Sequence, residues 1–295
     1  MAAALTELVA AIRARTALVP RVGVVLGSGL GGAADRVALD PPAGGDATGA
    51  GAPASDARAM GAVFATSELP HWPRSTVAGH DGKLVLGYWG GTPVAVLRGR
   101  THAYEGYPLA QITLPHRALA ALGATTLLVT NAVGAFNRAF APGDLMLVRD
   151  HVNRIGRRGL CTAAELASVP EVTRGALGRL RPYTPEVCAT LRAVALEQGI
   201  HLREGVLLAA PGPAYESAAE VQTARKWGAD AGCMSSTHEM DLAAALGLRT
   251  GAVSCITNYG TGLSANALDH REVEEVAGQA AARLERLLAG AVARL

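Results

Sequence analysis

Short apolar runs rich in β-branched residues alternate with longer alanine- and leucine-rich stretches through most of this chain. The runs have the length of strands, and the stretches between them are long enough to form helices. The expected strands are 22–26, 84–89, 93–97, 126–130, 145–148, 206–209 and 250–257. The expected helices are 109–122, 185–198, 217–227 and 238–246. This alternation predicts an α/β fold, with a twisted and mostly parallel or mixed β-sheet flanked by helices.

Both ends of the chain are predicted to be helical. Residues 1–15 carry Glu7 and two arginines in an alanine-rich pattern, so they lack the basic start and unbroken apolar core of a secretion signal. Residues 271–295 have the apolar spacing of an amphipathic helix that packs on the core. Residues 41–59 are mostly Gly, Ala, Pro, Asp and Ser, which predicts a flexible surface loop. The 295 residues suit one large domain or two small ones, and because nothing requires a second, we expect a single domain over 1–295.

Charge and cysteine content argue against several classes of protein. The chain has 27 Lys plus Arg against 25 Asp plus Glu, and the arginines are scattered, so nucleic acid and anionic membranes are not expected as partners. The four cysteines are far apart and form no CxxC pair, which is typical of buried thiols in a reducing cytosol. No apolar run approaches the roughly 20 residues that span a bilayer. We therefore expect a cytoplasmic protein.

The most polar cluster follows the expected strand 93–97. Residues 98–108 read RGRTHAYEGYP. Arg100 can offer a planar donor fork to a phosphate or carboxylate, His102 can add a donor, and Tyr104 has a flat face with a hydroxyl at its edge. Because open α/β sheets bind ligands beyond the carboxyl ends of their strands, the segment is interpreted as a ligand clamp. The alternative is an ordinary surface loop with solvated charges.

Further small or polar groups stand at or beside the ends of expected strands. GSGLGG (27–32) can turn backbone amides and the Ser28 hydroxyl toward an anion. The same turn can be plain geometry, and no acidic residue that ends a second strand about 20 positions on supports a dinucleotide site. The other segments are PRSTVAGH (73–80), NAVG (131–134), APGPAYE (210–216), CMSS (233–236) and ITN (256–258). Taken singly, each also has a structural interpretation, such as a helix start.

Taken together, these segments resemble the trimeric purine nucleoside phosphorylase family, which includes methylthioadenosine phosphorylases. The resemblance runs over nearly the whole chain. It is carried by GSGLG (27–31), PRSTVAGH (73–80), RTHAYEGYP (100–108), NAVG (131–134), GDLMLVRDH (143–151), GPAYE (212–216) and TN (257–258). It implies a nucleoside phosphorylase fold, a homotrimer, and inorganic phosphate as a co-substrate, with no cofactor or metal.

The resemblance also implies a role for individual residues. Those expected to bind phosphate are Ser28, His80, Arg100, His102, the Ala132 amide and Ser235. Those expected to hold the ribose are Tyr104, Met234 and His270. Those expected to receive the purine are Tyr215, Glu216 and Asn258, and the catalytic residues would be His80, Glu216 and Asn258.

The implied reaction makes these residue types sensible. Phosphorolysis passes through a cationic sugar, so it needs an anion on one side and a stabilised leaving base on the other. Glu216 can accept a hydrogen bond from purine N1–H, and Asn258 can bond O6 and N7. We therefore expect phosphorolysis of inosine, guanosine and their deoxy forms in purine salvage. This leaves Glu105 as a structural partner of nearby histidines and arginines.

The sequence also allows two other functions. A methylthioadenosine phosphorylase is disfavoured by Asn258, since an aspartate there would suit a 6-amino purine, and by the polar His270. A catalytically silent purine-binding relative is motivated by two departures from the family pattern. Cys233 stands where relatives have glycine, so a thiol is expected to narrow the sugar pocket. Residues 154–182 contain no Phe, Tyr or Trp, whereas relatives have an aromatic residue there that reaches into the neighbouring subunit's sugar pocket.

Overall fold

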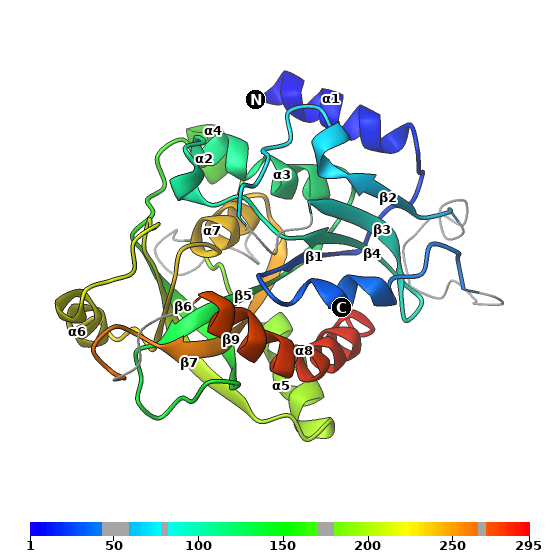
Figure 1. Cartoon of the computed structure of the whole chain (residues 1–295). Coiled ribbons are helices and arrows are strands. Elements are labelled where there is room, and N and C mark those ends of the chain that lie inside the picture. The colour runs from blue at the N-terminus through cyan, green and yellow to red at the C-terminus, as the bar shows by residue number, and fades with distance from the viewer. Residues whose placement is uncertain (43–58, 78–81, 170–179, 265–269) are drawn as a thin grey trace.

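The computed structural model describes residues 1–42, 59–77, 82–169, 180–264 and 270–295, except the side chains of 270–272 and 274. Within these residues the chain forms a mixed β-sheet flanked by helices (Figure 1). The predicted α/β class is therefore confirmed. The predicted flexible loop at 41–59 lies almost entirely outside the described residues and stays a prediction.

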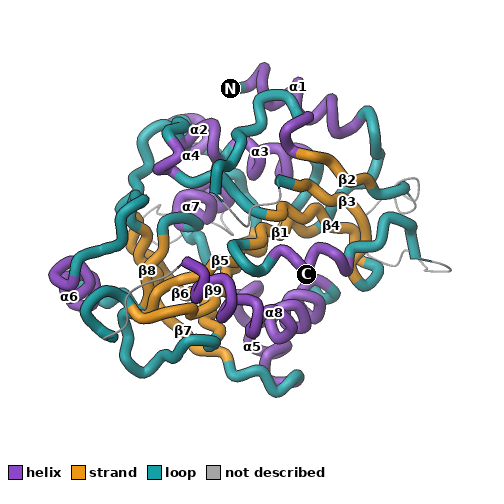
Figure 2. The backbone as a smooth tube through the Cα atoms, in the orientation of Figure 1, coloured by secondary structure: helices purple, strands orange, loops and turns teal. Residues whose placement is uncertain are grey.

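Nine strands can be traced in the described part of the chain. They are β1 (Val22–Leu26), β2 (Ala62–Ala65), β3 (Lys83–Trp89), β4 (Thr92–Arg98), β5 (Thr126–Ala135), β6 (Leu145–Asn153), β7 (Leu202–Ala209), β8 (Ala231–Cys233) and β9 (Arg249–Tyr259). Their order across the sheet is β2-β3-β4-β1-β5-β8-β7-β6-β9, and β5 pairs with β9 as well. Strands β5, β8, β7, β6 and β9 thus close into a ring, and the other four extend from it as an open sheet (Figure 2).

Helices cover this sheet from two sides. They are α1 (Ala2–Arg13), α2 (Leu109–Ile112), α3 (Leu114–Ala121), α4 (Ala163–Ala167), α5 (Pro185–Glu197), α6 (Ala218–Lys226), α7 (Thr237–Ala245) and α8 (His270–Val292), with short 3-10 helices η1 (Gly31–Arg36), η2 (Thr66–Glu68) and η3 (Ala103–Glu105). In Figure 1, α1 and α3 lie above strands β1 to β4, and the packed pair α5 and α8 lies below them.

All seven predicted strands are present, and most of the differences come from short elements. β2 and β8 were not predicted because four and three residues carry almost no periodicity. The helix expected over 109–122 divides at Thr113, because Pro115 in the first turn of α3 has no N–H to continue the hydrogen bonds of α2. α4 was also missed, although Thr162 and Glu165 form the capping box that marks its start.

Helix α7 is buried along its whole length, including His238, Glu239 and Asp241. It packs against α3 and against strands β6, β7 and β9. Charged side chains are seldom fully buried unless they are paired. Glu239 and Asp241 on α7 therefore need oppositely charged or hydrogen-bonding neighbours. Glu239 pairs with Arg100, and Asp241 pairs with Arg157.

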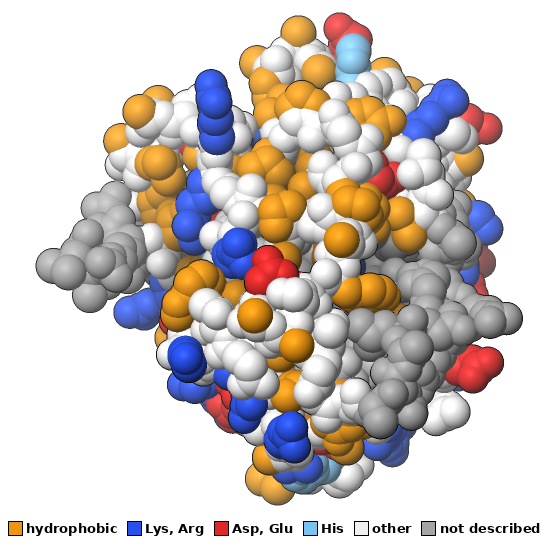
Figure 3. All heavy atoms as spheres, turned by 60° about the vertical axis from the view of Figure 1, so that its left-hand side comes forward, with side chains coloured by type: hydrophobic (Ala, Val, Ile, Leu, Met, Phe, Trp, Pro, Cys, Tyr) orange, Lys and Arg blue, Asp and Glu red, His pale blue; other side chains and the backbone are white. Residues whose placement is uncertain are grey.

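Two surface properties bear on possible partners. Within the described residues, no helix combines the length and apolar character needed to cross a membrane. On the face shown in Figure 3, Lys and Arg side chains are spread among hydrophobic and uncharged ones.

Candidate active site

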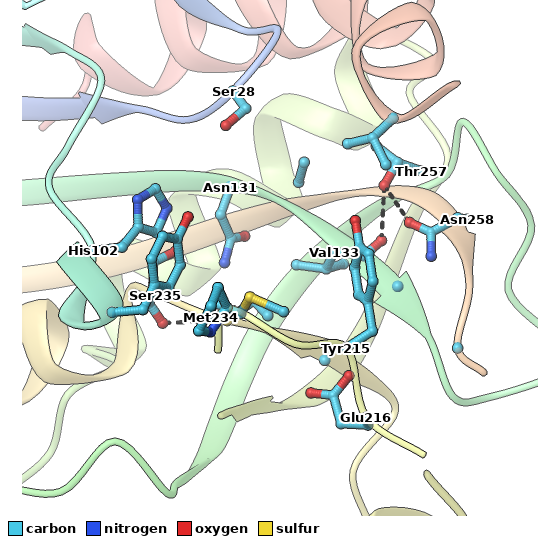
Figure 4. A pocket seen from close by; sticks show the side chains of 18 of the residues that line it. Ser28, His102, Asn131, Val133, Tyr215, Glu216, Met234, Ser235, Thr257 and Asn258 are labelled. Atoms are coloured by element: carbon cyan, nitrogen blue, oxygen red, sulfur yellow. Dashed lines mark hydrogen bonds between the residues drawn. The ribbon is translucent and has the colours of Figure 1, made fainter. Parts of the chain in front are cut away.

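Ten of the twelve predicted site residues line one cavity of about 240 Å³. They are Ser28, Arg100, His102, Tyr104, Ala132, Tyr215, Glu216, Met234, Ser235 and Asn258. They come from the ends of β1 and β4 in the open part of the sheet, from the ends of β7, β8 and β9 in the ring, and from β5, which joins the two parts (Figure 4). His80 and the side chain of His270 lie outside what the structure describes, and their roles stay predictions.

The guanidinium of Arg100 is fixed from two directions. Its Nε donates to Oε1 of Glu239 at 2.8 Å, and its Nη2 donates to the Thr130 carbonyl at 2.7 Å. The Arg100 and Glu239 side chains are 3% and 1% exposed. Burial alone would raise the pKa of Glu239, but Arg100 and His116 hold that pKa well below its usual range. The cavity is therefore bordered by a rigid buried cation that is suited to an anion.

The turn after β1 brings Ser28 to the same end of the cavity. Gly27 makes the close approach possible, because a Cβ there would lie 2.7 Å from the Asn131 Cα and 3.2 Å from Nη1 of Arg100. The amide of Gly27 donates to Thr130 Oγ1 at 3.2 Å. The backbone amides of this turn were expected to face an anion. The Gly27 amide instead bonds to β5 and so links β1 to that strand.

His102, two residues after Arg100, also lines the cavity. Its ring stacks on Tyr104, with centroids 4.9 Å apart and an interplanar angle of 12°. Burial and the charge of Arg100 lower the pKa of His102, which favours the neutral ring. Its Nδ1 lies 3.3 Å from Oε1 of Glu105. Glu105 also accepts from the backbone of His102 at 2.7 Å and of Thr76 at 2.6 Å, so it is a structural partner, as predicted.

The residues assigned to the ribose pack around Gly212. This glycine has a φ of 68°, and a Cβ there would lie 2.6 Å from Sδ of Met234 and 2.8 Å from Cδ1 of Tyr104. A larger residue at this position would therefore displace both side chains. Cys233 also borders the cavity, but its thiol donates to the Ser235 carbonyl at 3.2 Å and burial raises its pKa to about 12.

The end of the cavity where the purine is expected has different chemistry. Oε1 of Glu216 is buried and has no hydrogen-bond partner within the described residues. Burial raises the pKa of Glu216. Tyr215 beside it is 47% exposed. Asn258 accepts at Oδ1 from Thr257 Oγ1 at 2.8 Å (Figure 4). Its Nδ2 donates to the Tyr259 carbonyl at 3.0 Å.

Several residues at the cavity had no predicted role. Asn131, Val133, Phe136, Thr257 and Val273 line it. Asn131 and Thr257 stand inside recognised motifs, so the motifs themselves were the available signal. Glu239 had no predicted role either, because its contact with Arg100 joins residues that are 139 positions apart in the sequence.

The segment that departs from the family pattern is anchored on two helices. Arg157 pairs with Oδ2 of Asp241 on α7 at 2.6 Å. Arg117 on α3 pairs with Glu165 and donates to the Leu160 carbonyl at 2.7 Å. Tyr183, the aromatic residue that follows this segment, is buried against His151, with Oη and Nδ1 2.9 Å apart. The Tyr183 side chain therefore packs inside its own chain.

The described side chains include no group of three or more His, Cys, Asp or Glu residues placed to hold a metal ion. The cavity instead joins a fixed cation and hydroxyls at one end to an aromatic ring, a carboxylate and an amide at the other. This combination is typical of a protein whose site is suited to a small anion beside a flat, hydrogen-bonding ligand.

Comparisons with known proteins narrow that class. Residues 48–293 match the family model of the phosphorylase superfamily. The chain is 37% identical to purine nucleoside phosphorylase 1 of Geobacillus stearothermophilus over 87% of this chain and 84% of that protein. It is 34% identical to purine nucleoside phosphorylase 1 of Bacillus subtilis (strain 168), over 93% and 92%. A schistosoma purine nucleoside phosphorylase solved with hypoxanthine superposes with a TM-score of 0.79 at 28% identity, covering 99% of this chain and 96% of that one.

The chain therefore belongs to the purine nucleoside phosphorylase family within the phosphorylase superfamily. This confirms the predicted family and the predicted class of enzyme, a phosphorylase of purine nucleosides. Which purines it accepts is a separate question.

Proposed function

We propose that this protein cleaves 6-oxopurine nucleosides with inorganic phosphate. Inosine, guanosine and their 2′-deoxy forms would give the free base and ribose or deoxyribose 1-phosphate, as a step of purine salvage. The observation that carries the proposal is the unpartnered buried Oε1 of Glu216, which lies in the same cavity as Arg100. A buried carboxylate oxygen needs a donor, and the N1–H of a 6-oxopurine supplies one.

The proposed reaction uses the two ends of the cavity together. A phosphate oxygen bonds to the anomeric carbon while the bond to purine N9 breaks. The electron pair of the broken bond stays on the purine, which takes up the proton that the phosphate gives up. Arg100, His102, Ser28, Ser235 and the Ala132 amide would hold the phosphate, with His80 close by. The fixed donors stabilise charge without reorganising during the reaction.

The base would be recognised at the other end. Tyr215 would stack on the purine, and Glu216 would accept from N1–H and, in guanine, from the 2-amino group. Asn258 would bond O6 and N7 as negative charge develops on the base. The ribose would lie between Tyr104 and Met234, with His270 toward its 5′ side.

The proposal extends to the state of the protein. We propose a cytoplasmic homotrimer with one domain per chain and with no cofactor or metal besides the phosphate co-substrate. Neither nucleic acid nor membrane is a proposed partner, which is supported by the near balance of 27 basic and 25 acidic residues.

The test is a matrix of four nucleosides with and without phosphate. Purified protein should release base from inosine and guanosine only when phosphate is present, and much faster than from adenosine or methylthioadenosine. Release without phosphate would contradict phosphorolysis. Preference for methylthioadenosine would favour that phosphorylase instead, and purine binding without any turnover would favour the silent relative. The adenosine arm matters because a related Schistosoma mansoni enzyme was solved with adenosine.

Asn258→Asp should shift the preference toward adenosine. A carboxylate accepts from the 6-amino group but repels the O6 of inosine, so the adenosine to inosine ratio of kcat/KM should rise by about 100-fold. Measuring kcat/KM for both nucleosides checks this. An unchanged ratio would show that Asn258 does not contact the base edge.

Inosine use should fall on acidification at a higher pH than an ordinary glutamate would cause. Glu216 must be ionised to accept from N1–H, and burial raises its pKa, so protonation begins earlier as pH falls. A plot of kcat/KM for inosine against pH should show this acidic fall, and the fall should be absent in Glu216→Gln. Activity regained on return to neutral pH controls for unfolding. An acidic fall that persists in Glu216→Gln would come from the protonation of another side chain.

A further inference from the structure

Ser236 has a backbone conformation that residues with side chains rarely adopt. Its φ is 69° and its ψ is −46°, and among the described residues the other non-glycine position with positive φ is His71. The amide of Thr237 donates to the carbonyl of Ser235 at 2.8 Å, which makes a γ-turn centred on Ser236. Such a turn is strained, and strain of this kind persists only where surrounding contacts impose it.

Those contacts are present and buried. Ser236 is 1% exposed, and its carbonyl accepts from the Met240 amide at 2.9 Å in the first turn of α7. Its hydroxyl oxygen accepts from Nδ2 of Asn131 on β5 at 3.0 Å. On the N-terminal side of the turn, the Cys233 thiol donates to the Ser235 carbonyl at 3.2 Å.

The turn sets the position of Ser235. The hydroxyl oxygens of Ser235 and Ser236 lie 3.2 Å apart, and Ser235 borders the cavity while Ser236 does not. Because the Asn131 amide is a donor, the Ser236 hydroxyl accepts from it and can donate onward to Ser235. The Ser235 proton is then left to point into the cavity.

The same unit includes Arg100. Three residues after Ser236, Glu239 on α7 accepts from Nε of Arg100 at 2.8 Å. A change in the path of the chain at Ser236 would therefore move the serine and the start of the helix whose glutamate holds the arginine.

We propose that Ser236 is a positioning residue, which orients the Ser235 hydroxyl as a donor to phosphate through the Asn131–Ser236–Ser235 hydrogen-bond chain and its strained turn. The proposal rests on the proposed function for the identity of the anion. Ser236 acts through Ser235 and does not itself touch the ligand.

The experiment measures phosphate and hypoxanthine binding by calorimetry, with Tm as the measure of folding, in Ser236→Ala and Ser236→Gly. Loss of one oriented donor should raise the phosphate Kd about 10-fold in Ser236→Ala and leave the hypoxanthine Kd within about twofold. Ser236→Gly releases the strain, so its Tm should exceed that of Ser236→Ala by about 3 °C, but its phosphate Kd should be no better. Ser254→Ala is the matched control, because it also deletes a buried serine hydroxyl and should bind phosphate like the wild type.

The outcomes separate this inference from the proposed function. Wild-type phosphate affinity in both variants, or equal weakening of hypoxanthine, would overturn the positioning role. A Tm of Ser236→Gly below that of Ser236→Ala would overturn the strain. If the wild type binds phosphate but does not use it to cleave nucleosides, the proposed function fails while these binding comparisons still decide the role of Ser236. Absence of phosphate binding by the wild type would overturn both.

Discussion

Replacing Arg100 with methionine should lower kcat/KM for phosphate about 1000-fold, as expected when a fixed charge-stabilising donor is removed from a buried site. The variant should also be less stable by about 4 kcal/mol, because it leaves Glu239 buried without its cation. Steady-state kinetics at varied phosphate and denaturant unfolding measure the two effects. The KM for inosine should change far less than that for phosphate, since the purine end of the cavity is untouched.

Two further variants separate the loss of binding from the loss of stability. The double variant Arg100→Met, Glu239→Gln removes both buried charges, so stability should be largely recovered while phosphate use is not. Arg98→Met is the matched control, because Arg98 also ends β4 but pairs with the exposed Asp35. It should retain normal kinetics, since Arg98 does not line the cavity. A double variant with near-normal phosphate affinity would contradict the role of Arg100.

Glu216→Gln should lower kcat/KM for inosine about 100-fold, because a hydrogen bond to a charged, desolvated acceptor is replaced by a neutral one. The loss should be larger for guanosine, which offers Glu216 two donors instead of one. The phosphate KM should stay close to normal. Initial rates with both nucleosides, measured near neutral pH where the carboxylate of the wild type is ionised, check the prediction.

The matched control for this change lies one turn away on the same segment. Glu220 is exposed and caps α6 through Ser217, and glutamine can also serve in that cap. Glu220→Gln should therefore leave both nucleosides unaffected. If the two variants lose activity equally, charge near the cavity and not contact with the base explains the loss. If neither loses activity, Glu216 is not the purine ligand.

The fold was largely predictable because strands and helices carry local periodic patterns. The run at 22–26 became β1 without change, and Pro185–Glu197 became α5 within one residue of its predicted end. β8 was not predictable, because three residues have no period and its place depends on pairing with β5 and β7. Yet β8 leads directly to Met234 and Ser235, so this short element helps to shape the cavity.

Ten of the twelve predicted site residues line the cavity, but the bonds among them were not predictable. Motifs identified Arg100, Glu216 and Asn258 because each stands in a recognisable segment at a strand end. No motif indicated that Glu239 holds Arg100 or that Thr257 donates to Asn258. Such bonds depend on distances between side chains, and these are fixed only when the segments pack together.

The sequence by itself determined the alternation of strands and helices and the kinds of side chain that follow each strand, since both are properties of neighbouring residues. Only the tertiary structure decided how those side chains converge. Closing β5, β8, β7, β6 and β9 into a ring and pairing β1 with β5 bring the strand ends together. Burial of α7 places Glu239 and Asp241 beside arginines from other segments of the chain. The strained turn at Ser236 belongs to the same class, because long-range contacts from Asn131 and the start of α7 hold a backbone conformation that local preference opposes.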